Sequence, residues 1–464
     1  MPSRSDLAPH PAGVSPLCGN QKGTFAYTTV KDRLPVILTK CVDSISRELH
    51  AATTTTTASD ASSLAPLAQT ERATEGKQII AELSKLVYEL QRDRPLQRIN
   101  DTEEDAASWN SVLESLGGKE GGPATWFGTP WLFSECHMYR KIREIFVVTN
   151  YWKDHDVFAR QQKEPSFWGS VKSMEELAKH VKDVEVSTLD EELKTHVLRE
   201  FVQFSLWGNQ TDLSLLQNVS HADMHKLQTS TSASLQQLEE KIIVNDSKLL
   251  VDAISKIKNG RIDFILDNAG FELYADLCLA DWLVHSGVAK QVVIHAKRIP
   301  WFVSDTTERD FYWTLDAIQQ HATTIRDDTL HSRIQTWRAY LEKGTWKLTV
   351  DPFWTLPYSF WQLPTEGGNL WDDMCTSQLL IFKGDLNYRK CVYDGNWATT
   401  TPFSEALGGL NNPQTPPLVC LRTCKSDPVV GLRPGQAEDL DKADPDWRVN
   451  GKWGMIQYQA RAAQ

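Results

Sequence analysis

Polar side chains able to bind a metal ion or a phosphate follow an apolar run near the middle of the chain. Residues 264–266 are apolar enough for a central parallel strand, and Asp267 and Asn268 come directly after them. Gly270 permits a tight turn into a segment with helical spacing. In open α/β sheets, ligands bind at the carboxyl ends of strands, where the next helix points free N–H groups at anions. The sequence therefore predicts a metal-assisted phosphate site at Asp267 and Asn268.

Three further apolar runs show the same arrangement of a strand followed by charged residues. The runs and the residues after them are 301–303 with Asp305, 379–382 with Asp385, and 418–421 with Arg422 and Lys425. If all four runs are parallel strands of one sheet, their charged ends share one edge. We therefore expect carboxylates for a divalent cation and cations for a phosphate in one crevice.

Each of these residues also has an ordinary structural explanation. Asp267 and Asn268 are favoured helix caps, and Asp305 with the residues after it resembles a capping box. The segment after Asp385 could form a simple turn, and the two cations could lie on the surface. Carboxylates at two separate strand ends favour Mg²⁺ or Mn²⁺, which prefer oxygen ligands, over the capping explanation alone.

Other polar residues are weaker candidates for the same site. Glu272 falls in the first turn of the expected helix, where it can accept a hydrogen bond from a substrate hydroxyl. Asn209 and Asp212 follow an apolar helical segment and either cap the next helix or reach the crevice. His295 and Lys297 end another apolar run, and ordinary solvation of a strand end is the simpler expectation for both.

The composition is that of a globular protein with several structural units. The 464 residues exceed the roughly 250 to 300 at which one core stops growing, and 41% are hydrophobic. A net charge of −11 without a basic block argues against nucleic acid or an anionic membrane as partner. We see no apolar stretch of spanning length and no secretion signal, so a cytoplasmic or nuclear protein is expected. Eight scattered cysteines indicate neither a disulfide framework nor a zinc site.

The chain divides into a helical first half and a mixed second half. Apolar residues recur at helical spacing over 79–90 and 193–204, and Pro130 is suited to the first turn of a further helix. Strand-length runs alternate with helical segments from about residue 249 onward, which indicates βαβ units. The expected organisation is a tail over 1–22, a mainly helical domain over 23–245 and an α/β domain over 246–464. A threonine-rich segment, 51–63, is expected to be a loop between helices.

Several motifs of this chain match one known family. The most specific is Arg422-Thr423-Cys424-Lys425, which has the pattern Arg-Thr-x-Lys. The others are Lys31-Asp32-Arg33-Leu34-Pro35, Trp131-Leu132-Phe133-Ser134-Glu135, Leu206-Trp207-Gly208-Asn209, Asp267-Asn268-Ala269-Gly270 and Lys383-Gly384-Asp385-Leu386-Asn387-Tyr388-Arg389. At these residues the chain resembles the damage-control phosphatases, once called domain of unknown function 89, and in particular their third, eukaryotic subgroup.

The resemblance implies a fold, a cofactor and a reaction. The fold would be an N-terminal helical bundle on a Rossmann-like α/β/α domain with a mostly parallel sheet. A divalent ion, Mn²⁺, Ni²⁺, Co²⁺ or Mg²⁺, would be held by Asp267, Asn268 and Asp305. The protein would be a monomeric metabolite-repair hydrolase acting on small phosphate esters such as fructose 1-phosphate and fructose 6-phosphate. Substrate contacts would fall to Asp267, Asn268, Glu272, Asp385, Leu386, Asn387, Tyr388, Arg389 and Lys425, with Asp267, Asn268 and Lys425 as catalytic residues.

Alternative mechanisms and functions remain open on the sequence. We expect attack by metal-activated water, whereas a rival mechanism uses Asp267 as a nucleophile. Position 269 is alanine where haloacid-dehalogenase-like phosphatases place a second aspartate, which disfavours the rival. The alternative function is an S-adenosylmethionine-dependent carboxyl methyltransferase. The segment 267–270 contains a single glycine, Gly270, and is therefore unlike the glycine-rich loop of a nucleotide site. A third alternative is a non-enzymatic scaffold.

Overall fold

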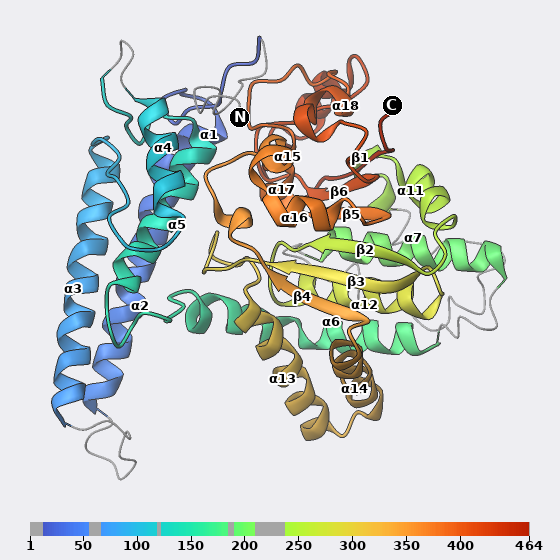
Figure 1. The fold of residues 1–464 in the computed structure, drawn as a ribbon, viewed down its shortest axis with the longest axis horizontal. Helices are drawn as coiled ribbons and strands as arrows, with labels where there is room; N and C mark the ends of the chain where they lie inside the picture. The colour runs from blue at the N-terminus through green and yellow to red at the C-terminus, as the bar shows by residue number, and fades with distance from the viewer. Residues whose placement is uncertain (1–12, 55–65, 118–121, 184–189, 209–236, 464) are drawn as a thin grey trace.

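The structure, a computed structural model, describes residues 13–54, 66–117, 122–183, 190–208 and 237–463. Figure 1 shows a helical N-terminal region beside an α/β region that contains the C-terminus. Two of the candidate residues, Asn209 and Asp212, lie outside the described residues. Most of the predicted loop 51–63 does so as well, while residues 51–54 form the last turn of a helix.

A seven-stranded sheet forms the centre of the α/β region. Its order is β1-β7-β6-β5-β2-β3-β4, and every neighbouring pair is parallel except β6 with β7. The strands are β1 (Ile242–Asn245), β2 (Gly260–Ile265), β3 (Ala289–Ala296), β4 (Trp346–Val350), β5 (Leu379–Lys383), β6 (Leu418–Thr423) and β7 (Gly454–Gln459). The predicted α/β fold with a mostly parallel sheet is therefore confirmed.

Three of the four predicted strands are present and one is wrong. The runs at 264–266, 379–382 and 418–421 belong to β2 and its end, to β5 and to β6. Residues 301–303 instead lie in a turn, where Phe302 and Val303 have positive φ values of 41° and 70°. The strand that flanks β2 on the side away from β5 is β3, which contains the apolar run that ends at His295.

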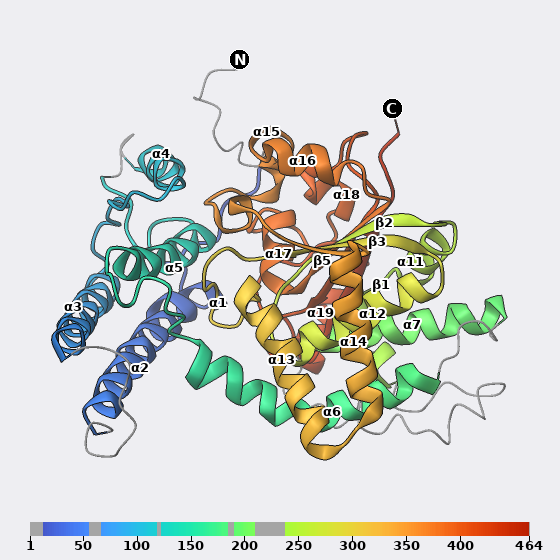
Figure 2. The same cartoon turned by 60° about the horizontal axis from the view of Figure 1, so that its bottom comes forward.

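Helices cover both faces of the sheet (Figures 1 and 2). Alternate residues of the strands point to opposite faces, so that Phe264 packs into one core cluster and Ile265 into the other. The helices that pack against the face of Phe264 are α6 (Glu164–Asp183), α7 (Glu191–Trp207), α11 (Ser247–Ile254), α12 (Phe271–His285), α13 (Glu308–Ile325) and α14 (Asp328–Lys343). The other face packs against α15 (Leu363–Glu366), α16 (Gly368–Met374), α17 (Gly384–Cys391), α18 (Phe403–Ala406) and α19 (Gln436–Ala443).

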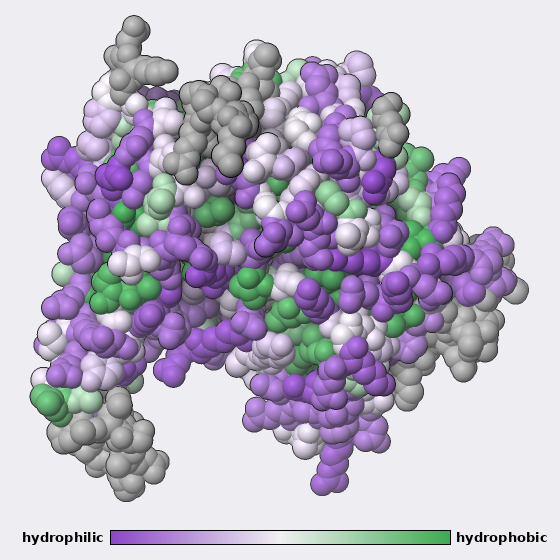
Figure 3. Space-filling model, in the orientation of Figure 1, coloured by the Kyte–Doolittle hydropathy of each residue, from purple (hydrophilic) through white to green (hydrophobic). Residues whose placement is uncertain are grey.

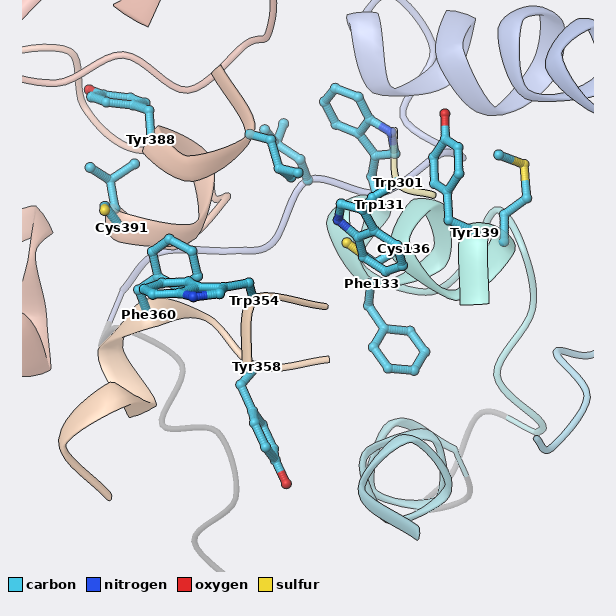
Figure 4. Packing of buried hydrophobic residues seen from close by; sticks show 14 of the residues in the cluster. Trp131, Phe133, Cys136, Tyr139, Trp301, Trp354, Tyr358, Phe360, Tyr388 and Cys391 are labelled. Carbon is cyan, nitrogen blue, oxygen red and sulfur yellow. The ribbon is translucent and has the colours of Figure 1, made fainter. Parts of the chain in front are cut away.

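The helical region shares a core with the α/β region. Its helices are α1 (Phe25–Thr28), α2 (Leu34–Thr54), α3 (Pro66–Gln91), α4 (Ala106–Leu116) and α5 (Trp131–Val147). Figure 4 shows Trp131 and Tyr139 of α5 beside Trp301, and the same core cluster includes Ile265 and Phe382 of the sheet. Because α6 and α7 also pack on the sheet and β1 begins at Ile242, helices and sheet are interleaved around the predicted boundary at 245/246. That boundary stays a prediction.

The predicted helices at 79–90 and 193–204 lie in α3 and α7, and Pro130 is the N-cap of α5. All eight cysteines are free. The face in Figure 3 is mostly hydrophilic, with apolar side chains in small groups. None of the helices in the described ranges is long and apolar enough to cross a membrane.

Candidate functional site

The end of β2 and the turn before α13 hold each other through backbone hydrogen bonds. The amide of Ala269 donates to Ser304 O at 2.8 Å, and the amide of Thr306 donates to Asp267 O at 2.7 Å. Asn268 and Asp305 form an isolated antiparallel bridge, and the Ser304 hydroxyl donates to Oδ1 of Asn268. The three residues predicted to hold a metal therefore lie together, although Asp305 does not follow a strand.

Gly384 makes room for the carboxylate of Asp267. Gly384 begins α17 with a positive φ of 81°, which L side chains rarely adopt. A Cβ atom at this position would overlap the Asp267 carboxylate. The Asp267 side chain thus occupies the space that a missing side chain leaves at the end of β5.

Neither aspartate acts as a helix cap, which was the ordinary explanation for both. The N-cap of α12 is Gly270, and it makes no side-chain capping bond. The N-cap of α13 is Thr307, which forms a capping box with Asp310. Asp267 and Asp305 are therefore available for another role.

Asn268 links two carboxylates. Its Nδ2 donates to Oδ2 of Asp267 at 2.7 Å and to Oε2 of Glu272 at 2.8 Å. Glu272 lies in the first turn of α12, where the helix dipole favours a negative charge. The predicted site residue Glu272 is therefore joined to the strand end through Asn268.

Three carboxylates of the site are buried close to one another. Asp267, Glu272 and Asp305 are 7%, 3% and 2% exposed. Burial raises the pKa of Asp267 well above its usual range, and the charges of Asp305 and Glu272 raise it further. Burial, outweighing Lys297, also raises the pKa of Asp305 to about 7. Oδ2 of Asp305 is buried without a hydrogen-bond partner. These carboxylates are arranged to receive a positive charge.

Lys297 is part of this site, and the expected solvation of His295 and Lys297 is wrong. Both are 1% exposed. Nζ of Lys297 donates to Leu266 O at 3.0 Å and to Oδ1 of Asn387 at 3.2 Å, and it lies 3.6 Å from Oδ2 of Asp305. Lys297 thus connects the ends of β2 and β3 with helix α17, next to the carboxylate of Asp305.

A second buried lysine supports Glu272 from the end of β5. Nζ of Lys383 lies 3.4 Å from Oε1 of Glu272 and 3.2 Å from Oδ1 of Asp276, and it donates to Ser205 O in α7. Burial alone would lower the pKa of a lysine, but Asp276 and Glu272 outweigh it and raise the pKa of Lys383. This ammonium therefore keeps its charge and fixes the position of Glu272.

The predicted substrate contacts after β5 belong to one short helix rather than a simple turn. Helix α17 carries all five of them, Asp385, Leu386, Asn387, Tyr388 and Arg389. Nδ2 of the Asn387 side chain donates to Leu266 O at 3.1 Å and to Lys383 O at 2.7 Å. This side chain therefore joins the ends of β2 and β5. Leu386 and Tyr388 are 5% and 0% exposed and pack in the core.

Arg389 connects α17 to the helical region. Its Nη1 donates to Oε2 of Glu135 in α5 at 3.0 Å, and its other nitrogens donate to both carboxylate oxygens of Asp394. The guanidinium also lies over the ring of Trp131, 3.9 Å from the centroid. Arg389 is thus fully engaged within the protein.

Arg422 lies beneath the edge of the sheet and not on the surface. It is 0% exposed in β6, and its Nε donates to Oδ1 of Asp385 at 2.7 Å. Its Nη atoms donate to the carbonyls of Pro428 and Ser426. Burial alone would raise the pKa of Asp385, but Arg422, Arg389 and the hydrogen bonds to this carboxylate lower it. Arg422 therefore shapes the loop after β6.

The loop after β6 carries Lys425, and Asp427 in the same loop contacts α1, the first helix of the chain. The amide of Lys425 donates to Oδ1 of Asp385 at 3.1 Å. The carboxylate of Asp427 accepts the amides of Phe25 and Ala26 at 3.3 and 3.2 Å, at the start of α1. Lys425 is thus held between α17 and the helical region, and its charge opposes the rise in the pKa of Asp267.

The side chains present suit a divalent cation. Asp267 and Asp305 offer carboxylate oxygens, one of which has no hydrogen-bond partner among the described residues, and Asn268 offers an amide oxygen. Mg²⁺ and Mn²⁺ accept all of these ligands. Among the described residues, no three His, Cys, Asp or Glu side chains cluster as a metal site. The candidate set contains only two carboxylates, with an amide as the third ligand.

Comparison with known proteins assigns the chain to a family. The model of the damage-control phosphatase ARMT1-like domain matches residues 29–440. The chain belongs to the ARMT1-like damage-control phosphatase family. Proteins named damage-control phosphatase ARMT1 are similar to it along nearly their whole length: the Danio rerio protein is 39% identical, covering 95% of each chain, and the Mus musculus and Homo sapiens proteins are 37% and 36% identical, covering 97% of this chain and 99% of theirs.

The family is one of phosphatases that in general depend on a divalent metal. One solved structure, of a DUF89 family protein from Pyrococcus horikoshii, is 17% identical and covers 75% of this chain and 89% of that chain, with a TM-score of 0.36. That likeness is too distant to bear on the site.

In this damage-control phosphatase, sequence reasoning gave no role in the site to three buried lysines and one glutamate. Lys297 and Lys383 each follow an apolar strand, and a lysine there signals a buried carboxylate partner. Lys163 gives no such signal, because it ends the π-helical turn η4 (Ala159–Lys163) far from the site in sequence. Its Nζ donates to Asp305 O at 3.2 Å. Glu135 gives only the weak signal of an acidic residue on a predicted helix.

Proposed function

We propose that this protein is a metal-dependent phosphatase for sugar phosphates, with fructose 1-phosphate and fructose 6-phosphate among its substrates. Asp267, Asn268 and Asp305 would hold the cation, which can be Mn²⁺, Ni²⁺, Co²⁺ or Mg²⁺. The protein would act as a monomer on small phosphate esters in the cytoplasm or nucleus. Membership in the damage-control phosphatase family supports the reaction class.

The observation that carries this proposal is the buried Oδ2 of Asp305, which accepts no hydrogen bond from a described residue and lies within a group of buried carboxylates. An ionised carboxylate out of water costs several kcal/mol unless a positive charge compensates it. Lys297 lies 3.6 Å from this oxygen, beyond hydrogen-bond distance. A divalent cation held by Asp267 and Asp305 would supply positive charge that offsets the effect of burial, which chiefly raises both pKa values, and the repulsion from Glu272.

The residues of the chain have distinct tasks in this reaction. Bound there, a divalent cation supplies positive charge to the phosphoryl group and acidity to a water molecule. Lys425 would neutralise charge that develops on the phosphoryl oxygens, and the free N–H groups at the start of α12 would add to this effect. Glu272, held by Lys383 and Asn268, would accept a hydrogen bond from a sugar hydroxyl.

Phosphate release from fructose 1-phosphate tests the proposal. Chelator-treated protein is assayed alone and with each of the four metal ions, together with Asp267→Asn and Lys425→Ala. We expect metal-restored release in the wild type and a loss of at least a hundredfold in both variants. Asp252→Asn and Lys452→Ala are the matched controls, because both residues are exposed, and they should retain full activity.

The outcomes separate the parts of the proposal. Release without any metal would overturn the metal requirement and leave a phosphatase. Release from other esters but not from fructose phosphates would overturn the substrate assignment. No release from a broad panel of phosphate esters would overturn the reaction itself, and S-adenosylmethionine binding would then be tested on the same protein.

A further inference from the structure

A cavity of about 820 Å³ lies at the amino ends of the strands, on the edge of the sheet opposite the site. Gly260 and Arg261 at the start of β2, Lys290 in β3 and Gln378 before β5 all line it. The six residues of β2 separate the two edges by about 20 Å. A molecule in this cavity is therefore remote from Asp267.

The charge of the cavity differs from that of the whole chain. Of the described residues that line it, five are cationic and none is acidic: Lys256, Lys258, Arg261, Lys290 and Arg461. The chain as a whole carries a net charge of −11. A concave surface lined by one sign of charge focuses its field and attracts the opposite charge.

Within the described residues, one of these cations is neutralised by ion pairs. Arg261 donates to both carboxylate oxygens of Asp263 and of Asp373. The three lysines are exposed and form no ion pair with any described residue. Arg461 donates to the carbonyl of Pro413 at 3.5 Å and forms no ion pair with the residues that the structure describes. Four cationic side chains thus share one cavity and form no ion pair with a described residue, although the charge of Lys258 acts on Glu191.

Helix ends do not account for this arrangement. Lysines are favoured at the C-terminus of a helix, and Lys256 lies two residues beyond the end of α11. Lys290 is five residues beyond the end of α12 and already within β3. Lys258 and Arg461 follow no helix end within one turn. The convergence of these elements therefore needs another explanation.

We propose that this cavity binds a small metabolite that carries a polyphosphate group, with nucleoside polyphosphates as the class that fills it. Its volume lies within the roughly 300–1,000 Å³ of small-molecule sites. The cations suit a chain of phosphates, while Asn259 and Gln378 offer amides. Ile257, Leu379, Pro417 and Tyr458 provide an apolar wall for a planar base. Such a ligand would be an effector and not the substrate of the opposite edge.

Calorimetric titration of the chelator-treated full chain tests this proposal. The probes are inorganic tripolyphosphate, adenosine triphosphate and adenosine. We expect saturable binding of the first two, tighter for the nucleotide, and a loss of at least tenfold in affinity for Lys256→Glu/Lys290→Glu. The control, Lys40→Glu/Lys77→Glu, makes the same charge change at exposed lysines of α2 and α3, and its affinity should change by less than twofold.

Two further variants locate the bound molecule. Lys425→Ala should retain the binding, because Lys425 lies at the other edge, and Tyr458→Ala should weaken the nucleotide but not tripolyphosphate. Equal losses in the two charge-reversed double variants would overturn the proposal in favour of non-specific attraction. Loss of binding in Lys425→Ala alone would place the anion at the carboxyl edge and overturn it too. If neither tripolyphosphate nor adenosine triphosphate bound to the wild type at concentrations up to 5 mM, the proposal would also be overturned.

Discussion

The two edges of the sheet place their charges in opposite environments. At the carboxyl edge, Lys297 and Lys383 are almost completely buried, and each lies between carboxylates and backbone carbonyls. At the amino edge, Lys256 and Lys290 are exposed and have no ion pair with a described residue. The same residue type is thus a fixed structural charge at one edge and a hydrated, movable one at the other.

This difference teaches what each edge is suited to do. Catalysis needs groups fixed within a fraction of an ångström, which buried and fully bonded side chains achieve. Capture of a diffusing anion needs charge that reaches the solvent, which exposed lysines supply. The carboxyl edge should therefore be sensitive to small changes of shape, and the amino edge only to changes of charge.

A single added methyl group gives the largest expected contrast. Gly384→Ala would place a Cβ atom on the Asp267 carboxylate, so phosphate release should fall about a hundredfold or more. Gly287→Ala at the amino edge is the matched control, because Gly287 also has a positive φ, of 72°, with nothing within 4 Å of the added atom. Steady-state kinetics of both variants check this. Equal losses would mean that backbone strain, and not displacement of Asp267, is responsible.

Two buried aspartates should give opposite pH dependences of stability. Burial raises the pKa of Asp276 to about 7, whereas His295 and Arg261 overcome burial and lower the pKa of Asp263. The folded protein thus holds a proton on Asp276 that the unfolded chain releases near pH 4, so stability falls as the pH rises from about 4 to 7. Asp263 contributes stability that is present above pH 4 and is lost as the pH falls below it.

Urea unfolding of the metal-free protein between pH 4.5 and 7.5 measures this difference. In the wild type, the free energy of unfolding should decline as the pH rises. Asp276→Asn should reduce the slope of this decline by up to about 1.4 kcal/mol per pH unit, and the remaining slope is due to Asp267 and Asp305. Asp263→Asn should lower the free energy of unfolding by a constant amount across this pH range, because Asp263 titrates below the range. An unchanged slope in Asp276→Asn would contradict the assignment.

A smaller effect is expected where the helical region supports the carboxyl edge. The ring of Phe302 stacks on Tyr139 of α5, with centroids 4.7 Å apart, in the turn just before Asp305. Phe302 and Val303 both have positive φ, which is strained for these residues, so the turn needs support from its surroundings. Tyr139→Leu should weaken Mn²⁺ binding about three- to tenfold, since such ring pairs contribute about 0.5–1.5 kcal/mol.

The control for this prediction is Tyr139→Phe, which keeps the ring and should bind Mn²⁺ as the wild type does. Hydrogen exchange of the amides of residues 304–306 in metal-free protein gives an independent readout. Exchange should be faster in Tyr139→Leu and unchanged in Tyr139→Phe. Equal exchange in all three proteins would show that the backbone hydrogen bonds alone hold the turn.

Much of the fold was predictable because the strands are buried on both faces. Such strands are continuous apolar runs, so β2, β5 and β6 are visible in the sequence. The run at 301–303 has the same composition but forms a turn, because its side chains fill the core between α5 and the sheet. Local composition reports burial, and here it could not distinguish a buried strand from a buried turn.

The candidate site was predictable to the extent that its residues follow strands directly. Asp267, Asn268 and Asp385 were placed by that rule, as were the cations after β6, whose Arg-Thr-x-Lys pattern also supports the resemblance. The contacts of Lys163 and Glu135 depend on how the helical region packs, which no local pattern encodes. Arg422 illustrates the converse, because its type suggested phosphate binding whereas its burial makes it a partner of Asp385.

The hydrogen bonds between Asp427 and the start of α1 determine which part of the structure can form last. This carboxylate accepts the amides of Phe25 and Ala26, residues 402 and 401 positions away. Contacts of such separation close a very long loop and form late in folding. During synthesis, the loop of Lys425 cannot be fixed until nearly the whole chain has left the ribosome. An incomplete chain therefore carries all the acidic residues of the carboxyl edge but lacks the lysine loop that completes it.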